Sequence, residues 1–291
     1  MNYINMFIED FTVLDHAYID QIEGFLGGTF FVSAEVIGRT TEEENVVLDF
    51  SIGKKQLKKA VDATMDHKLI IPKHLLVQEA DGRLSVTFDS GKYIAPSTAF
   101  YQLDASNYSI ENLTAALEQE IMKEMPENVE AVKIKLKYED FNRFGDNQSF
   151  YRYTHGLKTS SSLGCKRMGH GHINHIEIEI DGVKNPTVEK HICNKLHKKH
   201  LYIQENVFNE TEDKLHLRIQ VEEGIFDLAL DKSLTFKMPY ETTVENISKY
   251  LADAIVEIKP ECEVKVKAFE GFKKGATTIR KRRINYRSSI I

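Results

Sequence analysis

Hydrophobic and polar residues alternate along several stretches of this chain with the two-residue period of a β-strand. The clearest stretch is 173–180, where Ile176, Ile178 and Ile180 point to one side and the glutamates to the other, and 29–37 alternates in a similar way. The residues after Ser109 instead have apolar side chains at helical spacing, and Ser109 is a suitable N-cap. Strands interleaved with helices predict an α+β protein, with antiparallel strands covered by helices on one face.

Short segments of the first half reappear in the second half in the same order. These are 74–79 at 200–205, 109–113 at 243–247, and 132–135 at 264–267. In each half, a strand and a helix precede a two-stranded section, formed by 83–88 with 99–103 and by 215–221 with 226–230. A second helix and a last strand follow. We therefore predict two tandem domains, 1–145 and 146–291, each with a four-stranded antiparallel sheet and two helices, joined at the polar stretch 144–148.

The composition is that of a soluble globular protein, with 291 residues, 42% hydrophobic and 28% charged. The chain has no apolar run of membrane-spanning length, and residues 1–10 lack the features of a signal peptide. Its three cysteines are an odd, sparse set, unlike a disulfide framework. We therefore expect a cytoplasmic protein that does not bind a membrane.

The net charge of −6 argues against binding to nucleic acid. The exception is the C-terminal end, with the basic residues Lys273, Lys274, Arg280, Lys281, Arg282, Arg283 and Arg287. Such a basic tail is typically solvated and mobile, and its other possible role is to attract an anionic substrate.

Three histidines point to metal chemistry in the second half. His170 and His172 are two residues apart at the start of a predicted strand, so their imidazoles share one face. Gly171 between them lets another backbone or a ligand come close, and His155 follows an aromatic, strand-like stretch upstream. Three histidines with an open fourth position describe a catalytic zinc site, whereas Cys165 as fourth ligand would make the site structural.

These motifs resemble the 6-pyruvoyltetrahydropterin synthase and 6-carboxytetrahydropterin synthase family, whose units have the tunnelling fold. The second half has the family's Phe/Tyr-x-x-x-His, its Cys and its His-Gly-His, and the first half has its Lys-rich helix at 54–63 and its Asp-His. The resemblance implies zinc bound by His155, His170 and His172, and Cys165 as the proton-transfer residue. It also implies an assisting Asp-His pair.

The two halves depart from the family in complementary ways. The first half has Leu-Gly-Gly at 26–28 in place of His-Gly-His, and His16 is either a remnant of the third ligand or a surface or core histidine, so we expect no metal there. The second half has only His197 where the family has Asp-His. Family sites form where neighbouring units meet, so we predict a shared site in which Asp66 and His67 assist Cys165. The rival hypothesis uses His197 from the second half alone.

The family also anchors the pterin ring with a glutamate near the last strand. Glu270 is our first candidate because its position in the strand alternation suits an inward carboxylate, and Glu139 is its candidate counterpart in the first half. Either residue is otherwise a solvent-facing charge at a strand end.

The resemblance implies a zinc-dependent lyase that converts 7,8-dihydroneopterin triphosphate to 6-carboxytetrahydropterin, a precursor of queuosine and related deazaguanines. Formation of 6-pyruvoyltetrahydropterin is the alternative, because the four residues between Cys165 and His170 fall between the family's three and five. A non-catalytic pterin- or purine-binding protein with a structural zinc is another. Because two units are too few to close a family-like barrel, we expect a homo-oligomer.

Overall fold

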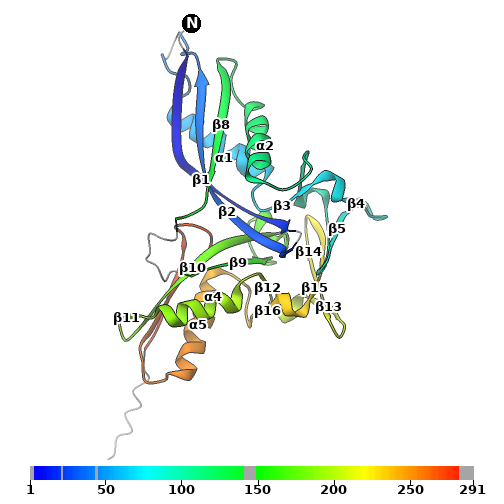
Figure 1. Cartoon of the computed structure of the whole chain (residues 1–291), viewed down its shortest axis with the longest axis vertical. Helices are drawn as coiled ribbons and strands as arrows, with labels where there is room; N and C mark the ends of the chain where they lie inside the picture. The colour runs from blue at the N-terminus through cyan, green and yellow to red at the C-terminus, as the bar shows by residue number, and fades with distance from the viewer. Residues whose placement is uncertain (1–2, 21, 43–44, 141–148, 282–291) are drawn as a thin grey trace, which may run out of the picture.

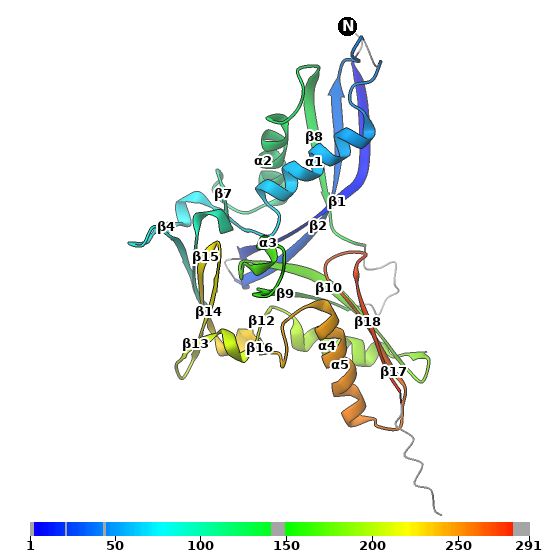
Figure 2. The ribbon, with the colours of Figure 1, turned by 180° about the vertical axis from the view of Figure 1, so that it is seen from behind.

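The computed structural model describes residues 3–20, 22–42, 45–140 and 149–281. The predicted domain boundary at 144–148 and the tail beyond Lys281 lie outside these residues. The described residues form an α+β fold with three sheets and a few helices (Figures 1 and 2). No helix in the described part is long and apolar enough to cross a membrane.

The first sheet has the strand order β7-β3-β1-β2-β8. Its centre is the long antiparallel hairpin of β1 and β2, and β8 pairs antiparallel with β2, whereas β3 and β7 add in parallel. Helices α1 and α2 pack their apolar side chains against this sheet. The bounds are β1 Ile4–Asp20, β2 Gly24–Gly38, α1 Phe50–Thr64, β3 Leu69–Pro72, β7 Phe100–Leu103, α2 Ile110–Met122 and β8 Val129–Lys137.

The second sheet has the order β16-β12-β9-β10-β17-β18, with β11 paired to β10. Helices α4 and α5 share its core, and the short α3 precedes β10. The bounds are β9 Phe150–His155, α3 Leu163–Lys166, β10 His170–Ile180, β11 Val183–Lys184, α4 Pro186–Leu196, β12 Lys199–Tyr202, β16 Thr235–Lys237, α5 Val244–Ile258, β17 Val264–Phe269 and β18 Gly275–Arg280.

The third sheet joins the two halves through antiparallel pairing of β6 with β15. Its order is β13-β14-β15-β6-β5-β4, with β4 Val77–Gln78, β5 Leu84–Phe88, β6 Gly91–Ala95, β13 Val207–Glu210, β14 Lys214–Val221 and β15 Gly224–Asp231. The pairing of 215–221 with 226–230 is confirmed, but the pairing of 83–88 with 99–103 is wrong. A two-residue turn after Phe88 pairs β5 with β6 instead, and β7 joins β3 in parallel.

The prediction of purely antiparallel four-stranded sheets is therefore too simple, because both main sheets carry parallel strands at one edge. The N-cap at Ser109 is confirmed, since its Oγ accepts from Asn112 N at 3.2 Å, and Thr243 Oγ1 accepts in the same way from Asn246 N at 3.3 Å. The basic residues at Lys274 and Arg280 are not a solvated tail: they flank or belong to β18 and pair with Asp15 and Asp253.

The two main sheets meet where the hairpin of β1 and β2 reaches β9 and β10 (Figures 1 and 2). Gly171, as predicted, allows another backbone to come close: a Cβ there would lie 2.8 Å from Gly27 Cα. A Cβ on Gly27 would lie 2.5 Å from His172 N. Gly27 of Leu-Gly-Gly and Gly171 of His-Gly-His therefore pack against each other. A side chain at either position would push the two halves apart.

Candidate active site

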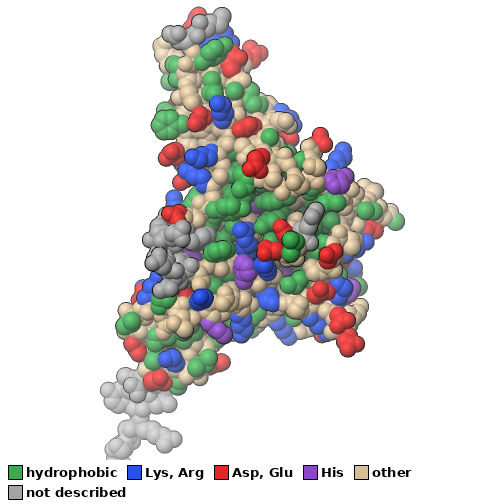
Figure 3. Space-filling model, in the orientation of Figure 1, with side chains coloured by type: hydrophobic (Ala, Val, Ile, Leu, Met, Phe, Trp, Pro, Cys, Tyr) green, Lys and Arg blue, Asp and Glu red, His purple; other side chains and the backbone are tan. Residues whose placement is uncertain are grey.

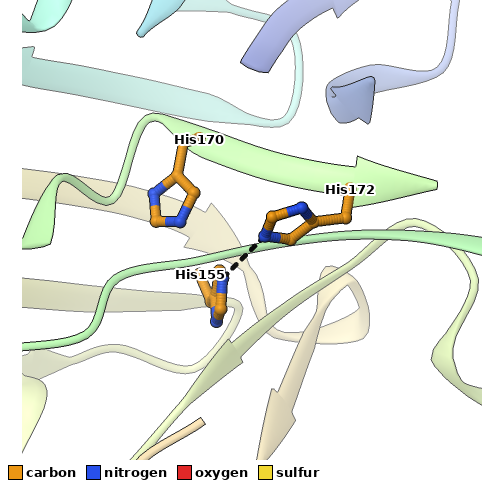
Figure 4. Close-up of side chains that lie close together, drawn as sticks. All are labelled: His155, His170 and His172. Carbon is orange, nitrogen blue, oxygen red and sulfur yellow. Dashed lines mark hydrogen bonds between the residues drawn. The ribbon is translucent and has the colours of Figure 1, made fainter. Parts of the chain in front are cut away.

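His155, His170 and His172 lie together in the second half, each less than 3% exposed. One ring nitrogen of each lies within 4.8 Å of the others, and Figure 4 shows the three imidazoles converging on a common point. The pairing of β9 with β10 sets this arrangement, because His155 stands directly opposite His170, and His172 is two residues further along the same strand.

The Nδ1 atom of each of these rings has a partner outside the cluster. His155 Nδ1 lies 3.0 Å from Thr242 Oγ1, just before α5, and His170 Nδ1 donates to the Arg167 carbonyl at 2.5 Å. His172 Nδ1 lies 3.1 Å from Asp15 Oδ1, although the contact is not aligned as a hydrogen bond. Such outer partners fix the tautomer of a metal-binding histidine, and here they leave every Nε2 for the shared centre.

The spacing and protonation of the rings fit a tetrahedral divalent cation. His155 Nε2 lies 3.3 Å from His172 Nε2. Two nitrogens bound tetrahedrally to zinc at its usual bond length are also separated by about 3.3 Å. Burial and the neighbouring imidazoles hold the pKa values of His155 and His170 well below 6.5, so these rings are neutral and able to coordinate.

Cys165 lies on the short helix α3 and hydrogen-bonds to His67, whose ring in turn lies close to that of His170. Burial raises the pKa of its thiol, but hydrogen bonding to His67, the charge of His67 and hydrogen bonds from Ser162 and Ser160 together lower it below 9.0. The serine-rich segment before α3 thus contributes contacts to the thiol. Cys165 is not a member of the metal-binding group found among the described residues.

Asp66 and His67 come from the first half and reach this thiol. Asp66 Oδ2 lies 2.5 Å from His67 Nδ1, which leaves Nε2 of His67 for Cys165. Burial lowers the pKa of His67, but the hydrogen bonds to Asp66 and Cys165 and their charges raise it to about 10. The His67 ring lies 5.0 Å from that of His170, and a Cβ on Gly164 of α3 would lie 2.8 Å from His67 Cβ. Helix α3 and the segment that contains Asp66 and His67 are therefore in direct contact.

His197, the rival partner, lies elsewhere. It follows α4, accepts a hydrogen bond from Arg152 N at 3.3 Å and packs edge-on against Phe150. These contacts are at the beginning of β9, whereas His155 is at its end, about 10 to 16 Å further along the strand.

Glu270 and Glu139 occupy different surroundings. Glu270 lies close enough to Tyr153 for its charge to add to the effect of burial in raising the pKa of that tyrosine. The Tyr153 ring packs against both His155 and His172, with centroids 5.0 and 5.5 Å apart, so Glu270 is one side chain from the cluster. Glu139 is 4% exposed and lines a hollow of about 380 Å³ with Lys267 and Lys274, among others.

Comparison with known proteins supports the resemblance in the first half. The family model for 6-pyruvoyl tetrahydropterin synthase matches residues 14–147. Residues 14–147 belong to this family. The match covers Asp66 and His67 and ends before β9, so it does not include the three histidines.

Solved structures of the same enzyme are also similar to this chain. The 6-pyruvoyl tetrahydropterin synthase of Plasmodium falciparum is 21% identical, with 46% of this chain and 91% of that chain covered and a TM-score of 0.38. That of Plasmodium vivax is 12% identical over 97% of this chain and 99% of that chain, with a TM-score of 0.23. A search of curated proteins gave no match.

The strand register shows what the first half has in place of the histidine cluster. Tyr18 stands opposite Leu26 on β1 and β2, as His155 stands opposite His170 on β9 and β10. Gly28 takes the place of His172. None of these three side chains is a usual zinc ligand.

The interpretation of His16 as a remnant of the third ligand is therefore wrong. It is a fully buried core histidine at the position that corresponds to Tyr153, and its Nε2 lies 2.7 Å from the Tyr108 hydroxyl. Register also corrects the counterpart of Glu270: pairing of β8 with β2 places Tyr138 there, one residue before Glu139.

Asp15 is a further residue at the histidine cluster, one that the sequence motifs did not indicate. It is 2% exposed and lies between His172 and Lys274. The signal in the sequence is a carboxylate within 13–19, a stretch whose other residues except His16 are apolar or aromatic, and such a residue requires a partner when it is buried.

Proposed function

We propose that this chain is a zinc-dependent lyase of the pterin synthase type. The observation that carries the proposal is the convergence of three Nε2 atoms beside the pair formed by Cys165 and His67. His155, His170 and His172 would hold the cation. A bound zinc ion polarises a hydroxyl or carbonyl oxygen of the substrate side chain.

The Cys165 pair then supplies the proton transfer. A lowered thiol pKa beside an imidazolium whose own pKa is raised favours a thiolate–imidazolium pair. Sγ of Cys165 takes a proton from a carbon of the substrate side chain and returns it later, while Nε2 of His67 stabilises the thiolate. Asp66 holds the His67 ring in place through Nδ1.

The proposed substrate is 7,8-dihydroneopterin triphosphate, which loses triphosphate and, for the carboxy product, also releases the two outer side-chain carbons as a two-carbon aldehyde. We favour 6-carboxytetrahydropterin as product, on the route to queuosine, with 6-pyruvoyltetrahydropterin as the alternative. The carboxylate of Glu270 would pair with two adjacent N–H donors of the pterin ring. Its place beside Tyr153 favours it over Glu139.

A structural zinc in a non-catalytic pterin- or purine-binding protein is the competing function. That reading needs Cys165 as a fourth ligand. The hydrogen bond of Cys165 to His67 and its absence from the metal-binding group of the described residues favour catalysis.

The repeated register supports two tandem tunnelling-fold domains, near 1–145 and 146–291. In the part of the chain that the structure describes, β8 and β18 end the first two sheets. Open edges of this kind favour pairing with another chain. We therefore propose a homo-oligomer in which several copies close a barrel. Lysines, arginines, aspartates and glutamates are interspersed over the face in Figure 3, so this face has no single basic patch for nucleic acid.

Incubation of the purified, zinc-loaded protein with 7,8-dihydroneopterin triphosphate tests the proposal. We expect release of triphosphate and a product with the mass of 6-carboxytetrahydropterin, or of the pyruvoyl compound if the alternative holds. The Cys165→Ala variant should retain zinc and lose turnover. Loss of zinc in that variant, together with an unreactive thiol in the parent, would favour the structural site.

A further inference from the structure

Asp15 is a buried carboxylate from the first half that contacts a metal-ligand histidine of the second. Its Oδ1 lies 3.1 Å from His172 Nδ1 and accepts a hydrogen bond from Thr29 Oγ1 at 2.7 Å, and its Oδ2 lies 3.1 Å from Lys274 Nζ. A buried charge is destabilising without such partners, so this side chain is held in one place. Gly271, with φ +67°, also packs against it, and a Cβ there would lie 2.8 Å from Asp15 Oδ1.

The main chain of Asp15 holds the other part of the site. Its N–H donates to Asp66 Oδ1 at 2.9 Å, and its carbonyl accepts from His67 N at 2.7 Å. One residue therefore fixes both a metal ligand, through its side chain, and the proton-transfer pair, through its backbone.

The second half contains a counterpart with the opposite charge. Arg152 takes the place of Asp15 in the strand register, and its main chain makes the same links: its N–H donates to His197 Nδ1 at 3.3 Å, and its carbonyl accepts from Lys198 N at 2.8 Å. Its side chain, however, donates to Gly27 O at 3.1 Å. The backbone link is thus common to both places, whereas the carboxylate is found only beside the histidine cluster.

We propose that Asp15 is a positioning residue that orients His172 for metal binding and increases the affinity of the site. A carboxylate beside Nδ1 keeps the proton on that atom, directs the Nε2 lone pair to the cation and makes the ring a stronger ligand. The inference rests on the proposed metal site. Loss of an outer carboxylate partner typically weakens metal binding about 10- to 100-fold.

Competition with a chelator measures this effect directly on the full chain. We expect Asp15→Asn to bind zinc about 10- to 100-fold more weakly than the parent. Its cobalt-substituted form should show shifted visible absorption bands, because the ligand field that His172 contributes to the metal changes. Arg152→Gln is the matched control and should leave both readouts unchanged. Zinc affinity of Asp15→Asn within twofold of the parent would overturn the inference.

Thr29→Val provides a second test if Asp15→Asn fails to fold without metal. This change removes a donor to Asp15 Oδ1 and leaves the carboxylate itself, and it also removes the acceptor of Ile173 N. We expect zinc affinity to fall roughly threefold to tenfold, the size of one hydrogen bond, and parental affinity would contradict the role of Asp15.

The same measurements separate this inference from the proposed function. If the parent takes up no zinc, or takes it up equally after His170→Ala, the proposed metal site fails and the inference falls with it. If the parent binds zinc through His170 and Asp15→Asn binds it equally well, only the inference fails.

Discussion

The two halves of this chain place different side chains on the same scaffold. At the end of β9 and the start of β10, His155, His170 and His172 form a cluster with outer partners for each ring. The equivalent positions on β1 and β2 hold Tyr18 and Leu26, with a glycine in the third place.

The first-half counterpart is filled by an aromatic cluster. Tyr18 stacks on Tyr108 with ring centroids 4.3 Å apart, and Tyr108 also contacts His16. Tyr138 and Phe30 pack 4.6 Å apart. A scaffold that repeats its register therefore does not repeat its chemistry, and this half contributes packing at its own position while it supplies Asp15, Asp66 and His67 to the other.

Alanine substitution at one pair of corresponding positions, His170 and Leu26, should give the largest contrast between the two halves. His170→Ala removes a ligand, so we expect no measurable zinc binding and no turnover. Leu26→Ala removes a side chain that is 1% exposed at the equivalent position, and should cost about 2 to 5 kcal/mol of stability while zinc binding persists. Metal analysis and thermal unfolding of both variants check this. If Leu26→Ala lost zinc and His170→Ala retained it, the metal site would have to be assigned to the first half instead.

Asp66 and His197 form the second pair, since each bonds to the main chain of the strand beside it. We expect Asp66→Ala to lower turnover about 100- to 10,000-fold, because His67 loses the group that orients it and supports its charge. His197→Ala should leave turnover close to that of the parent. Unchanged turnover in Asp66→Ala would reject a site shared between the halves.

The pH dependence of Cys165 alkylation should show a smaller effect, which tests the contact of this thiol with the first half. Because the folded pKa of Cys165 lies below 9.0, its reaction should rise with pH through a midpoint below that value. In His67→Ala, burial acts without the opposing imidazolium, so the midpoint should move upward. Cys193, whose pKa burial raises to about 12, should stay unreactive and serves as the internal control. Equal midpoints in parent and variant would exclude the Cys165–His67 pair.

Tyr108→Phe should have the smallest effect. It removes the hydroxyl that lies 2.7 Å from His16 Nε2 and leaves a buried ring nitrogen without that partner. We expect a loss of about 1 to 3 kcal/mol in the free energy of unfolding, with zinc affinity unchanged. Denaturant titration measures the first quantity. A change in zinc affinity would mean that the first-half cluster influences the metal site.

Local patterns in the sequence were sufficient to predict much of this arrangement. Periodicity and N-cap residues place α2 and α5, and the spacing of the histidines places their rings on one face of β10. These features depend on residues a few positions apart, where side-chain direction follows from the period of the element.

Features that depend on pairing between distant strands could not be predicted in the same way. The parallel pairing of β3 with β1 and the antiparallel pairing of β6 with β15 bring together residues far apart in sequence. The role of Asp15 depends on β1 crossing against β10, and the identity of Tyr18 as the counterpart of His155 depends on a register that a shift of two residues would change. A short motif does not contain this information.

An anomalous-difference map collected at the zinc edge from zinc-loaded crystals tests the central claim most directly. The account predicts one strong peak per chain between the three histidines, about 2.0 to 2.1 Å from Nε2 of His155, His170 and His172. It predicts no peak near Tyr18 and Leu26. A peak bonded to Cys165 as a fourth protein ligand would contradict the catalytic site, and the absence of any peak at the three histidines would contradict the metal centre itself.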